Sequence, residues 1–506
     1  MIKFGIGQPV PRTEDARLLT GGGRYTDDQN QPGQLYAAFV RSPHAHAEMT
    51  AVETADAAAM PGVVAVYTIA DLDAAGVGPL PCLFPLKNRD GSPYIAPPRP
   101  ALARDRVRHV GDPVAMVVAE TLWQARNAAE AVFVDYADLP SITDTAAALA
   151  AEAAQVWEQA PSSQCFDWEA GDEAATDAGF AKAAHVVRLD IVNNRVVPNP
   201  LEGRACLAWI EEETGRSVLS VTSQGVHSLQ KQLAKNIFRI PEKSLRVITG
   251  DVGGGFGMKI FNYPEYVCTL FAARALGRPV KWTAERVESF LSDDHGRDHV
   301  SHAELALDAD GVFLALKVDT VANLGAYLST YGPFIPTEAG VAMLAGSYRT
   351  PAIYARVRGV FTNTQPVDAY RGAGRPEAAY LLERLIDYAA RQTGMDPAEI
   401  RRRNSLAASA RPSETVLGET YDTGDFQQNL EDALAMADRA GFPARRKEAA
   451  KRGKLRGLGL STYIEACSGG GPEEATIQVM GDGRVVVAIG TQTNGQGHET
   501  AYKQIV

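Results

Sequence analysis

The stretch SLRVITGDVGGGFGMK, residues 244–259, reads as a β-strand that runs straight into a glycine-rich loop. Its first half alternates apolar and polar residues and includes β-branched ones, which favours a strand. Glycine in the second half allows positive φ angles and lets another group approach the backbone closely. Successive N–H groups of such a loop can face an anionic or oxo ligand. The alternative is a tight strand-to-helix turn that binds nothing.

Two nucleotide-binding motifs rely on glycine-rich loops, and this loop matches neither. A dinucleotide fingerprint needs glycine at its first, third and sixth positions. The sixth position is Met258 when counted from Gly253 and Ile260 when counted from Gly255. A phosphate-binding loop needs Gly-Lys-Ser/Thr, whereas Lys259 stands between Met258 and Ile260. A nucleotide-dependent enzyme is therefore the weakest interpretation.

Three further segments carry polar donors beside glycine. GTQTNGQGHET, residues 490–500, places amides, a histidine and threonines before a predicted helix N-terminus, where anions are stabilised. In VDAYRGAGRPEAAY, residues 367–380, Arg371 and Arg375 flank a glycine turn, and their planar guanidinium groups suit an anionic group. Gln224 ends a predicted strand. Each segment taken alone is also compatible with ordinary solvated or hydrogen-bonding side chains.

Composition limits the classes of protein. The 506 residues are 45 % apolar and 22 % charged, which is typical of a globular protein of several domains. The formal charge of −11 argues against a nucleic-acid-binding surface. The N-terminus lacks a signal-peptide core and no apolar run reaches the about 18 residues of a membrane span. We therefore expect a cytoplasmic protein without a membrane span.

The cysteines are isolated in the sequence and form no CxxC pair, which predicts neither a zinc ribbon nor an iron–sulfur cluster in this chain. We interpret them as buried free thiols, the usual state of single cysteines. They are Cys82, Cys165, Cys206, Cys268 and Cys467.

Changes in pattern along the chain predict an α+β fold in several parts. Residues 1–150 read as a small α/β domain, residues 151–172 as a connector, residues 173–404 as a larger mixed domain and residues 405–506 as a third segment. The chain ends at Val506, in the first turns of a predicted helix. We therefore expect the last domain to be incomplete, or completed by a separate chain.

Turn and cap signals predict particular elements within these parts. Asp310–Gly311 and Asp482–Gly483 each stand at the turn of a predicted β-hairpin. An amphipathic stretch predicts a helix that begins at Pro376 and ends at Gly394.

Taken together, these segments resemble the large, molybdenum-cofactor-binding subunit of the xanthine dehydrogenase/aldehyde oxidase/carbon monoxide dehydrogenase family. The N-terminal motifs resemble the family's α/β hammerhead domain, and the later ones resemble its mixed α/β molybdopterin-binding domains. In chain order the motifs are RTEDARLLTGGGRYTDD, AAFVRSPHAHA, VGDPVAMVVAET, RVVPNPLEGRACLA, TSQGVHSLQ, GDVGGGFGMK, AYRGAGRPEAAY, MDPAEIRRRN, GLGLSTYIEACSGGGPEEA and GTQTNGQGHET.

The resemblance implies which residues contact a molybdenum–pterin cofactor, in its cytosine dinucleotide form. No protein side chain is expected to ligate the metal, which agrees with the amides, guanidinium groups and backbone donors found above. The expected contacts are Gln224, Gly255, Phe256, Gly257, Arg371, Gln496, Gly497, His498 and Thr500.

The implied reaction is hydroxylation of an electron-poor C–H with oxygen derived from water. The family's glutamate base belongs to a C-terminal Gly-Glu motif that lies beyond residue 506, so no catalytic residue is assigned here. Glu202 and Glu465 fall in matching segments, but the resemblance gives neither of them that role. This chain alone is not expected to turn over.

Two departures from the family pattern bear on the substrate. Purine-oxidising members carry a glutamate where this chain has Ile260, and a site without that polar anchor discriminates poorly for purines. Copper-containing carbon monoxide oxidisers carry a cysteine in the loop that here reads Gly372-Ala373-Gly374. The sequence therefore favours an aldehyde or an N-heteroaromatic substrate.

The resemblance also implies partners, because this chain encodes no iron–sulfur or flavin motif to carry electrons away. They are a small 2Fe–2S subunit and a medium FAD subunit, assembled as a dimer of heterotrimers. A non-catalytic paralogue or binding module that keeps the fold is the alternative to an enzyme.

Overall fold

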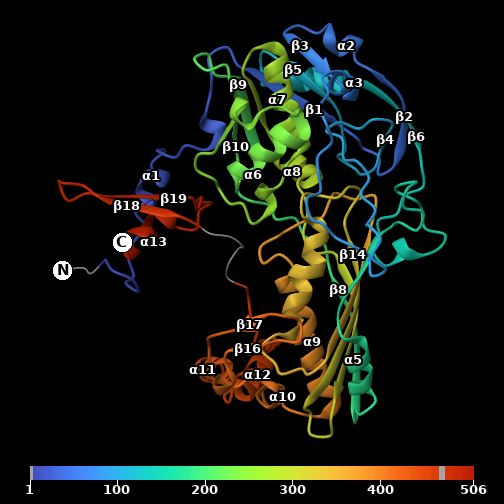
Figure 1. The fold of residues 1–506 in the computed structure, drawn as a ribbon, viewed down its shortest axis with the longest axis vertical. Coiled ribbons are helices and arrows are strands. Elements are labelled where there is room, and N and C mark those ends of the chain that lie inside the picture. Colours follow the sequence, from blue (N-terminus) through green and yellow to red (C-terminus); the bar gives the residue numbers. More distant parts are fainter. Residues whose placement is uncertain (1–3, 467–472) are drawn as a thin grey trace.

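The computed structural model describes residues 4–466 and 473–506 and has a mixed α/β architecture, which confirms the predicted fold class. Figure 1 shows two large sheets arranged one beyond the other along the longest axis, with helices on their faces. The last strands, β18 and β19, lie to one side, next to helix α1 from the start of the chain.

A seven-stranded sheet carries the predicted glycine loop at one edge. The pairing of β1 with β12 joins N-terminal strands to strands that follow the predicted connector, so both groups share one sheet. Helix α7 (Pro264–Leu276) packs on one face and α4 (Leu122–Glu130) on the other. The strand order is β11 (Leu245–Ile248), β10 (Ser217–Val221), β9 (Ala205–Ile210), β12 (Val280–Thr283), β1 (Leu35–Arg41), β5 (Pro113–Ala119), β3 (Val63–Tyr67).

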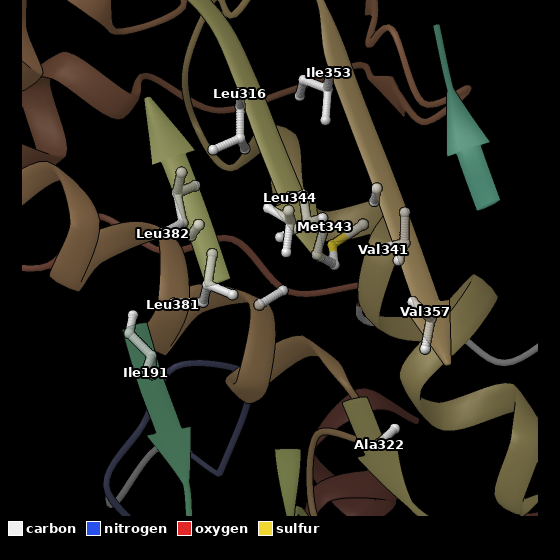
Figure 2. Packing of buried hydrophobic residues seen from close by; sticks show 14 of the residues in the cluster. Ile191, Leu316, Ala322, Val341, Met343, Leu344, Ile353, Val357, Leu381 and Leu382 are labelled. Atoms are coloured by element: carbon white, nitrogen blue, oxygen red, sulfur yellow. The ribbon is translucent and has the colours of Figure 1, made fainter. Parts of the chain in front are cut away.

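A five-stranded sheet forms the second large layer. Alternate residues of its strands pack on α9 (Arg375–Thr393) on one face and on α5 (Glu173–Phe180) on the other. Figure 2 shows Leu382 of α9 near Leu316 of the sheet, and Leu381 of α9 near Ile191; the four residues belong to one buried cluster. The strand order is β7 (Gln164–Gly171), β15 (Ile353–Val360), β14 (Phe313–Asn323), β13 (His299–Leu307), β8 (His185–Asn193).

The predicted turns and the predicted long helix are confirmed. β13 and β14 pair as a hairpin across Asp310–Gly311, and β18 (Ala475–Val479) pairs with β19 (Val485–Ile489) across Asp482–Gly483. Helix α9 begins at Arg375, one residue before the predicted start, and is capped by Gly394 at φ +70°.

Smaller elements complete the fold. They are α1 (Asp15–Leu19), β2 (Ala47–Glu53), α2 (Ala55–Ala58), α3 (Ile69–Ala74), β4 (Arg106–Val107), β6 (Phe133–Asp138), α6 (Val226–Lys231), α8 (Arg286–Ser292), α10 (Pro397–Asn404), β16 (Ser413–Glu414), β17 (Thr420–Tyr421), α11 (Phe426–Met436), α12 (Phe442–Lys451) and α13 (His498–Ile505). None of the helices found in the described residues is long and apolar enough to cross a bilayer.

The thiols are free, as predicted for single cysteines. Cys165, Cys206 and Cys268 are buried and Cys82 is half-buried. Burial raises the pKa of each of these four thiols above its ordinary value. Cys467 lies outside the described residues.

Candidate cofactor site

The first glycine loop connects β11 to a short 3-10 turn, Met258–Ile260, that precedes α7. Gly254 (φ +91°), Phe256 (φ +56°) and Gly257 (φ +95°) have left-handed backbones. A Cβ at Gly255 would lie 2.3 Å from the side chain of Gln224, and a Cβ at Gly257 would lie 2.6 Å from the carbonyl oxygen of Ala369. The glycines therefore let three chain segments meet at van der Waals contact.

Gln224 is held against this loop through its side chain. Its Oε1 accepts hydrogen bonds from the backbone N–H groups of Gly257 (2.9 Å) and Lys259 (3.3 Å). The backbone N–H of Gln224 also donates to the Lys259 carbonyl (3.0 Å). Both lone-pair sites of the amide oxygen are thus used within the protein, while the NH2 group has no hydrogen-bond partner in the part of the chain that the structure describes.

Arg371 is joined to the same loop through the backbone. Its N–H donates to the carbonyl of Phe256 (2.9 Å), and its own carbonyl accepts from Arg297 (2.8 Å). The Arg371 side chain is exposed, and among residues 4–466 and 473–506 its guanidinium group has no hydrogen-bond or ion-pair partner. A planar donor fork on a segment that is bonded to this loop suits a polar, anionic ligand.

Lys259 and Glu202 form an anchor beneath the loop that the sequence motifs did not reveal. The Lys259 side chain is fully buried, and its Nζ donates to the carboxylate and the carbonyl of Glu202, each at 2.9 Å. The same carboxylate accepts from the backbone N–H of Gly253 (2.7 Å). Burial lowers the pKa of Lys259, and the Glu202 carboxylate opposes this. Both residues stand in quoted motifs, but spacing gives no sign that they pair.

A buried charge cluster, formed by Arg204, Glu265, Asp293 and Arg41, supports this anchor. Arg204 is fully buried and donates to Asp293 (2.6 Å) and to Glu265 (2.7 Å). Burial acts to raise the pKa of Glu265, but Arg204 and Arg41 outweigh it and hold that pKa at about 2. Because Arg204 follows Glu202 by two residues, the cluster connects the loop anchor to the core.

The second glycine loop reaches this site at Ser223. Gln492 donates from its amide to the carbonyl of Ser223, which directly precedes Gln224. A cleft of about 610 Å³ is lined by Gly253 and Gly254 of the first loop and by Thr493 and Gly495 of the second. The two glycine-rich motifs, some 240 positions apart in the printed sequence, therefore share one cleft.

The predicted contacts in the second loop have differing surroundings. Gln496 accepts from the backbone N–H of Asn494, and Gly497 (φ +83°) is the N-cap of α13. The Nδ1 of His498 is buried without a hydrogen-bond partner among the described residues. The Thr500 hydroxyl accepts from the backbone N–H of Thr13. The roles of all four residues toward a cofactor stay predictions.

The residues fit the implied molybdenum–pterin group in their chemistry. Within residues 4–466 and 473–506, the Gln224 NH2 group and the Arg371 guanidinium have no hydrogen-bond partner and can donate to a ligand. Among the described residues no cluster of three or more His, Cys, Asp or Glu side chains could hold a metal ion directly. Such donors bind an oxo- and phosphate-bearing group through hydrogen bonds rather than through metal ligation.

Asp368 fixes the turn that carries Arg371. Its carboxylate accepts from the backbone N–H groups of Tyr331 (2.8 Å) and Ala369 (2.7 Å), and it is almost completely buried. Burial, with a contribution from Asp294, raises the pKa of Asp368 to about 7. The turn next to the glycine loop is therefore built on a carboxyl group that titrates near neutrality.

The titration of Asp368 predicts a pH-dependent effect of Asp368→Asn. The pKa of Asp368 is higher in the folded state than in the unfolded chain. Its contribution to the free energy of unfolding is therefore complete below about pH 4 and is lost as the pH rises through 7. The melting temperature of Asp368→Asn relative to the wild type should therefore be higher at pH 8 than at pH 5. If the melting temperatures of variant and wild type differ by the same amount at pH 5 and pH 8, Asp368 does not titrate between these pH values.

Comparison with known protein families agrees with this geometry. The model of the aldehyde oxidase and xanthine dehydrogenase a/b hammerhead domain matches residues 20–140. Two models of molybdopterin cofactor-binding domains match residues 156–405 and residues 432–506. The domain boundaries drawn from the sequence remain predictions.

Curated proteins and solved structures are similar along nearly the whole chain. The carbon monoxide dehydrogenase large chain of Hydrogenophaga pseudoflava is 36 % identical over 97 % of this chain and 63 % of its own length. Subunit gamma of the 6-hydroxypseudooxynicotine dehydrogenase complex of Paenarthrobacter nicotinovorans is 35 % identical over 99 % of this chain and 63 % of its own length. Quinoline 2-oxidoreductase from Pseudomonas putida 86 has a TM-score of 0.90 at 34 % identity, covering 100 % of this chain and 64 % of that one.

The fold, the paired glycine loops and the matched domains define a molybdopterin-binding protein. The chain belongs to the family of molybdenum-cofactor-binding large subunits of xanthine dehydrogenase, aldehyde oxidase and carbon monoxide dehydrogenase, which confirms the resemblance seen in the sequence motifs. It spans about 63 % of the length of the curated relatives given above.

Proposed function

We propose that this chain holds the molybdenum–pterin cofactor of a hydroxylase that acts on an aldehyde or an N-heteroaromatic compound. The observation that carries the proposal is the convergence of the Gln224 amide, the backbone of the first glycine loop and the backbone of Arg371, whose guanidinium has no partner among the described residues. When bound, the cofactor supplies the two-electron redox chemistry of the reaction.

The residues of this chain bind and orient the cofactor. The NH2 group of Gln224 and the guanidinium of Arg371 donate to its polar atoms, while Gly255 and Gly257 let Gln224 and the turn before Arg371 pack against the loop. The Lys259–Glu202 anchor keeps the donors in place, so that they need no reorganisation when the cofactor binds. The catalytic base is not among the residues assigned here.

The substrate class rests on Ile260 and on the Gly372-Ala373-Gly374 loop. Ile260 is half-buried against the core of the seven-stranded sheet and offers no polar group to a purine. The loop after Arg371 contains no cysteine. Relatives named quinoline 2-oxidoreductase and nicotine 6-hydroxylase large subunit support an N-heteroaromatic substrate. A carbon monoxide dehydrogenase large chain is similar to the same degree, so the choice against carbon monoxide rests on the loop after Arg371.

The remaining parts of the proposed enzyme are a small 2Fe–2S subunit, a medium FAD subunit and the cytosine dinucleotide form of the cofactor. The two subunits are proposed because electrons must leave the molybdenum and this chain carries no CxxC pair. The cytosine dinucleotide form is proposed from the family resemblance alone. A relative described as a subunit of a dehydrogenase complex supports a multi-subunit assembly.

The test is metal and pterin analysis of the complete enzyme that contains this chain, purified with its co-expressed partner subunits. We expect molybdenum and pterin in equal amounts, and reduction of a dye acceptor with an aldehyde or a quinoline-type heterocycle but not with carbon monoxide. A complex without molybdenum would exclude the proposal. Bound molybdenum without turnover of any tested substrate would favour the non-catalytic binding module instead.

A further inference from the structure

Residues 12–25, here called the N-terminal strap, lie against the first glycine loop. The Asp251 carboxylate accepts from the Arg17 guanidinium at 2.6 and 3.1 Å and from the backbone N–H of Arg24 at 2.7 Å. The Asp251 N–H donates in return to the Arg24 carbonyl (3.0 Å). A Cβ at Gly250 would lie 2.1 Å from that carbonyl oxygen, so the strap and the loop are in direct backbone contact.

The same strap also holds the second glycine loop and the start of α13. The Arg17 guanidinium reaches the Glu499 carboxylate at 3.0 Å, so one side chain pairs with a residue of each loop segment. The backbone N–H of Thr13 donates to the Thr500 hydroxyl (2.8 Å), and that hydroxyl donates to the Glu14 carboxylate. Glu14 and Thr500 are both buried in this contact. Figure 1 shows α1 beside α13 and the β18–β19 hairpin.

The strap and both loops line one cleft. Arg12, Glu14 and Arg17 face it together with the loop residues named above. Apart from the strap contacts, the side-chain hydrogen bond found in the described residues between the second loop and the surroundings of the first is that of Gln492 to Ser223. The relative position of the loops therefore depends largely on the strap.

We propose that the N-terminal strap is a positioning element of the cofactor site, in which Arg17 fixes the second glycine loop relative to the first. The inference rests on the proposed function, because positioning matters only if both loops serve one cofactor. Arginine suits the task, since its planar fork pairs with two carboxylates at once, whereas the lysine ammonium is a single point charge.

The strap is expected to act locally rather than on global stability. Arg17 is 39 % exposed, and exposed ion pairs contribute little to the folding of a large chain. Local opening, in contrast, is governed by the few contacts that close a segment. Loss of Arg17 should therefore loosen residues 490–500 while leaving the melting temperature almost unchanged.

The test compares Arg17→Met, Arg17→Lys and Glu499→Gln with the wild type in the co-purified complex. Amide hydrogen exchange within residues 490–500 should be roughly tenfold faster in Arg17→Met, with Arg17→Lys and Glu499→Gln in between. Molybdenum should also dissociate faster from Arg17→Met during dialysis. The matched control is Arg104→Met, which removes an exposed bidentate pair with Asp73 outside both loops and should change neither readout.

The outcomes separate the two proposals. Unchanged exchange of residues 490–500, or an unchanged rate of molybdenum loss, in Arg17→Met would overturn the positioning role. A wild-type complex that contains no molybdenum would overturn the proposed function instead, because hydrogen exchange reports the state of the loop independently of the metal.

Discussion

Gly257→Ala is expected to abolish retention of the cofactor and to lower the free energy of unfolding by about 2–4 kcal/mol. The backbone of Gly257 has φ +95°, which costs an L-residue energy before any contact is considered. The new Cβ would also lie 2.6 Å from the carbonyl oxygen of Ala369, a backbone atom that cannot rotate away. The loop must then move and lose the hydrogen bond from Gly257 to Gln224. Urea unfolding and molybdenum content measure the two effects.

Gly277→Ala is the matched control for this substitution. Gly277 caps α7 at φ +61°, and nothing lies within 4 Å of the position its Cβ would take. Gly277→Ala should therefore lower the free energy of unfolding by about 1 kcal/mol, from backbone strain alone, and the protein should keep its molybdenum. If Gly257→Ala retains molybdenum and unfolds like Gly277→Ala, the close approach at Gly257 has no part in binding.

Local signals predicted the elements whose determinants are local. Asp310–Gly311 and Asp482–Gly483 give the turn conformation of a hairpin by themselves, and the structure has both hairpins. The parallel pairing of β1 with β12 could not be predicted in this way. Leu35 meets Val280 across the sheet, and no residue near either strand specifies a partner so distant in sequence.

In the candidate site, too, features set by local sequence could be predicted and features set by the tertiary fold could not. Its donor groups could be chosen from residue type and from glycine neighbours, but their contact follows only from the tertiary fold. Lys259 and Arg204 were missed because charged side chains are ordinarily exposed, and both are fully buried here. Their partners, Glu202 and Glu265, are not marked by any local pattern.

Arg204→Met is expected to lower the free energy of unfolding by about 3–5 kcal/mol at neutral pH. Arg204 is the cation that pairs with Asp293, whose Oδ2 already lacks a hydrogen-bond partner among the described residues. It also shares Glu265 with Arg41 and stacks on the ring of Tyr263 at 3.8 Å. Methionine fills much of the volume but leaves Asp293 as a buried, unpaired charge, which is the costly event.

The pH dependence of Arg204→Met gives this prediction its sharpest check. In the wild type the pKa of Glu265 is about 2, below its ordinary 4.5, so its contribution is present above about pH 4.5 and is lost as pH falls toward 2. In the variant the freed carboxylates bind protons as pH falls, so the destabilisation should shrink between pH 7 and pH 4.

Two further variants serve as controls. Arg204→Met/Asp293→Asn should regain part of the lost free energy of unfolding, whereas Arg104→Met, at an exposed pair, should cost at most about 1 kcal/mol. If Arg204→Met lost no more stability than Arg104→Met at pH 7, Asp293 would not be left as a costly unpaired charge.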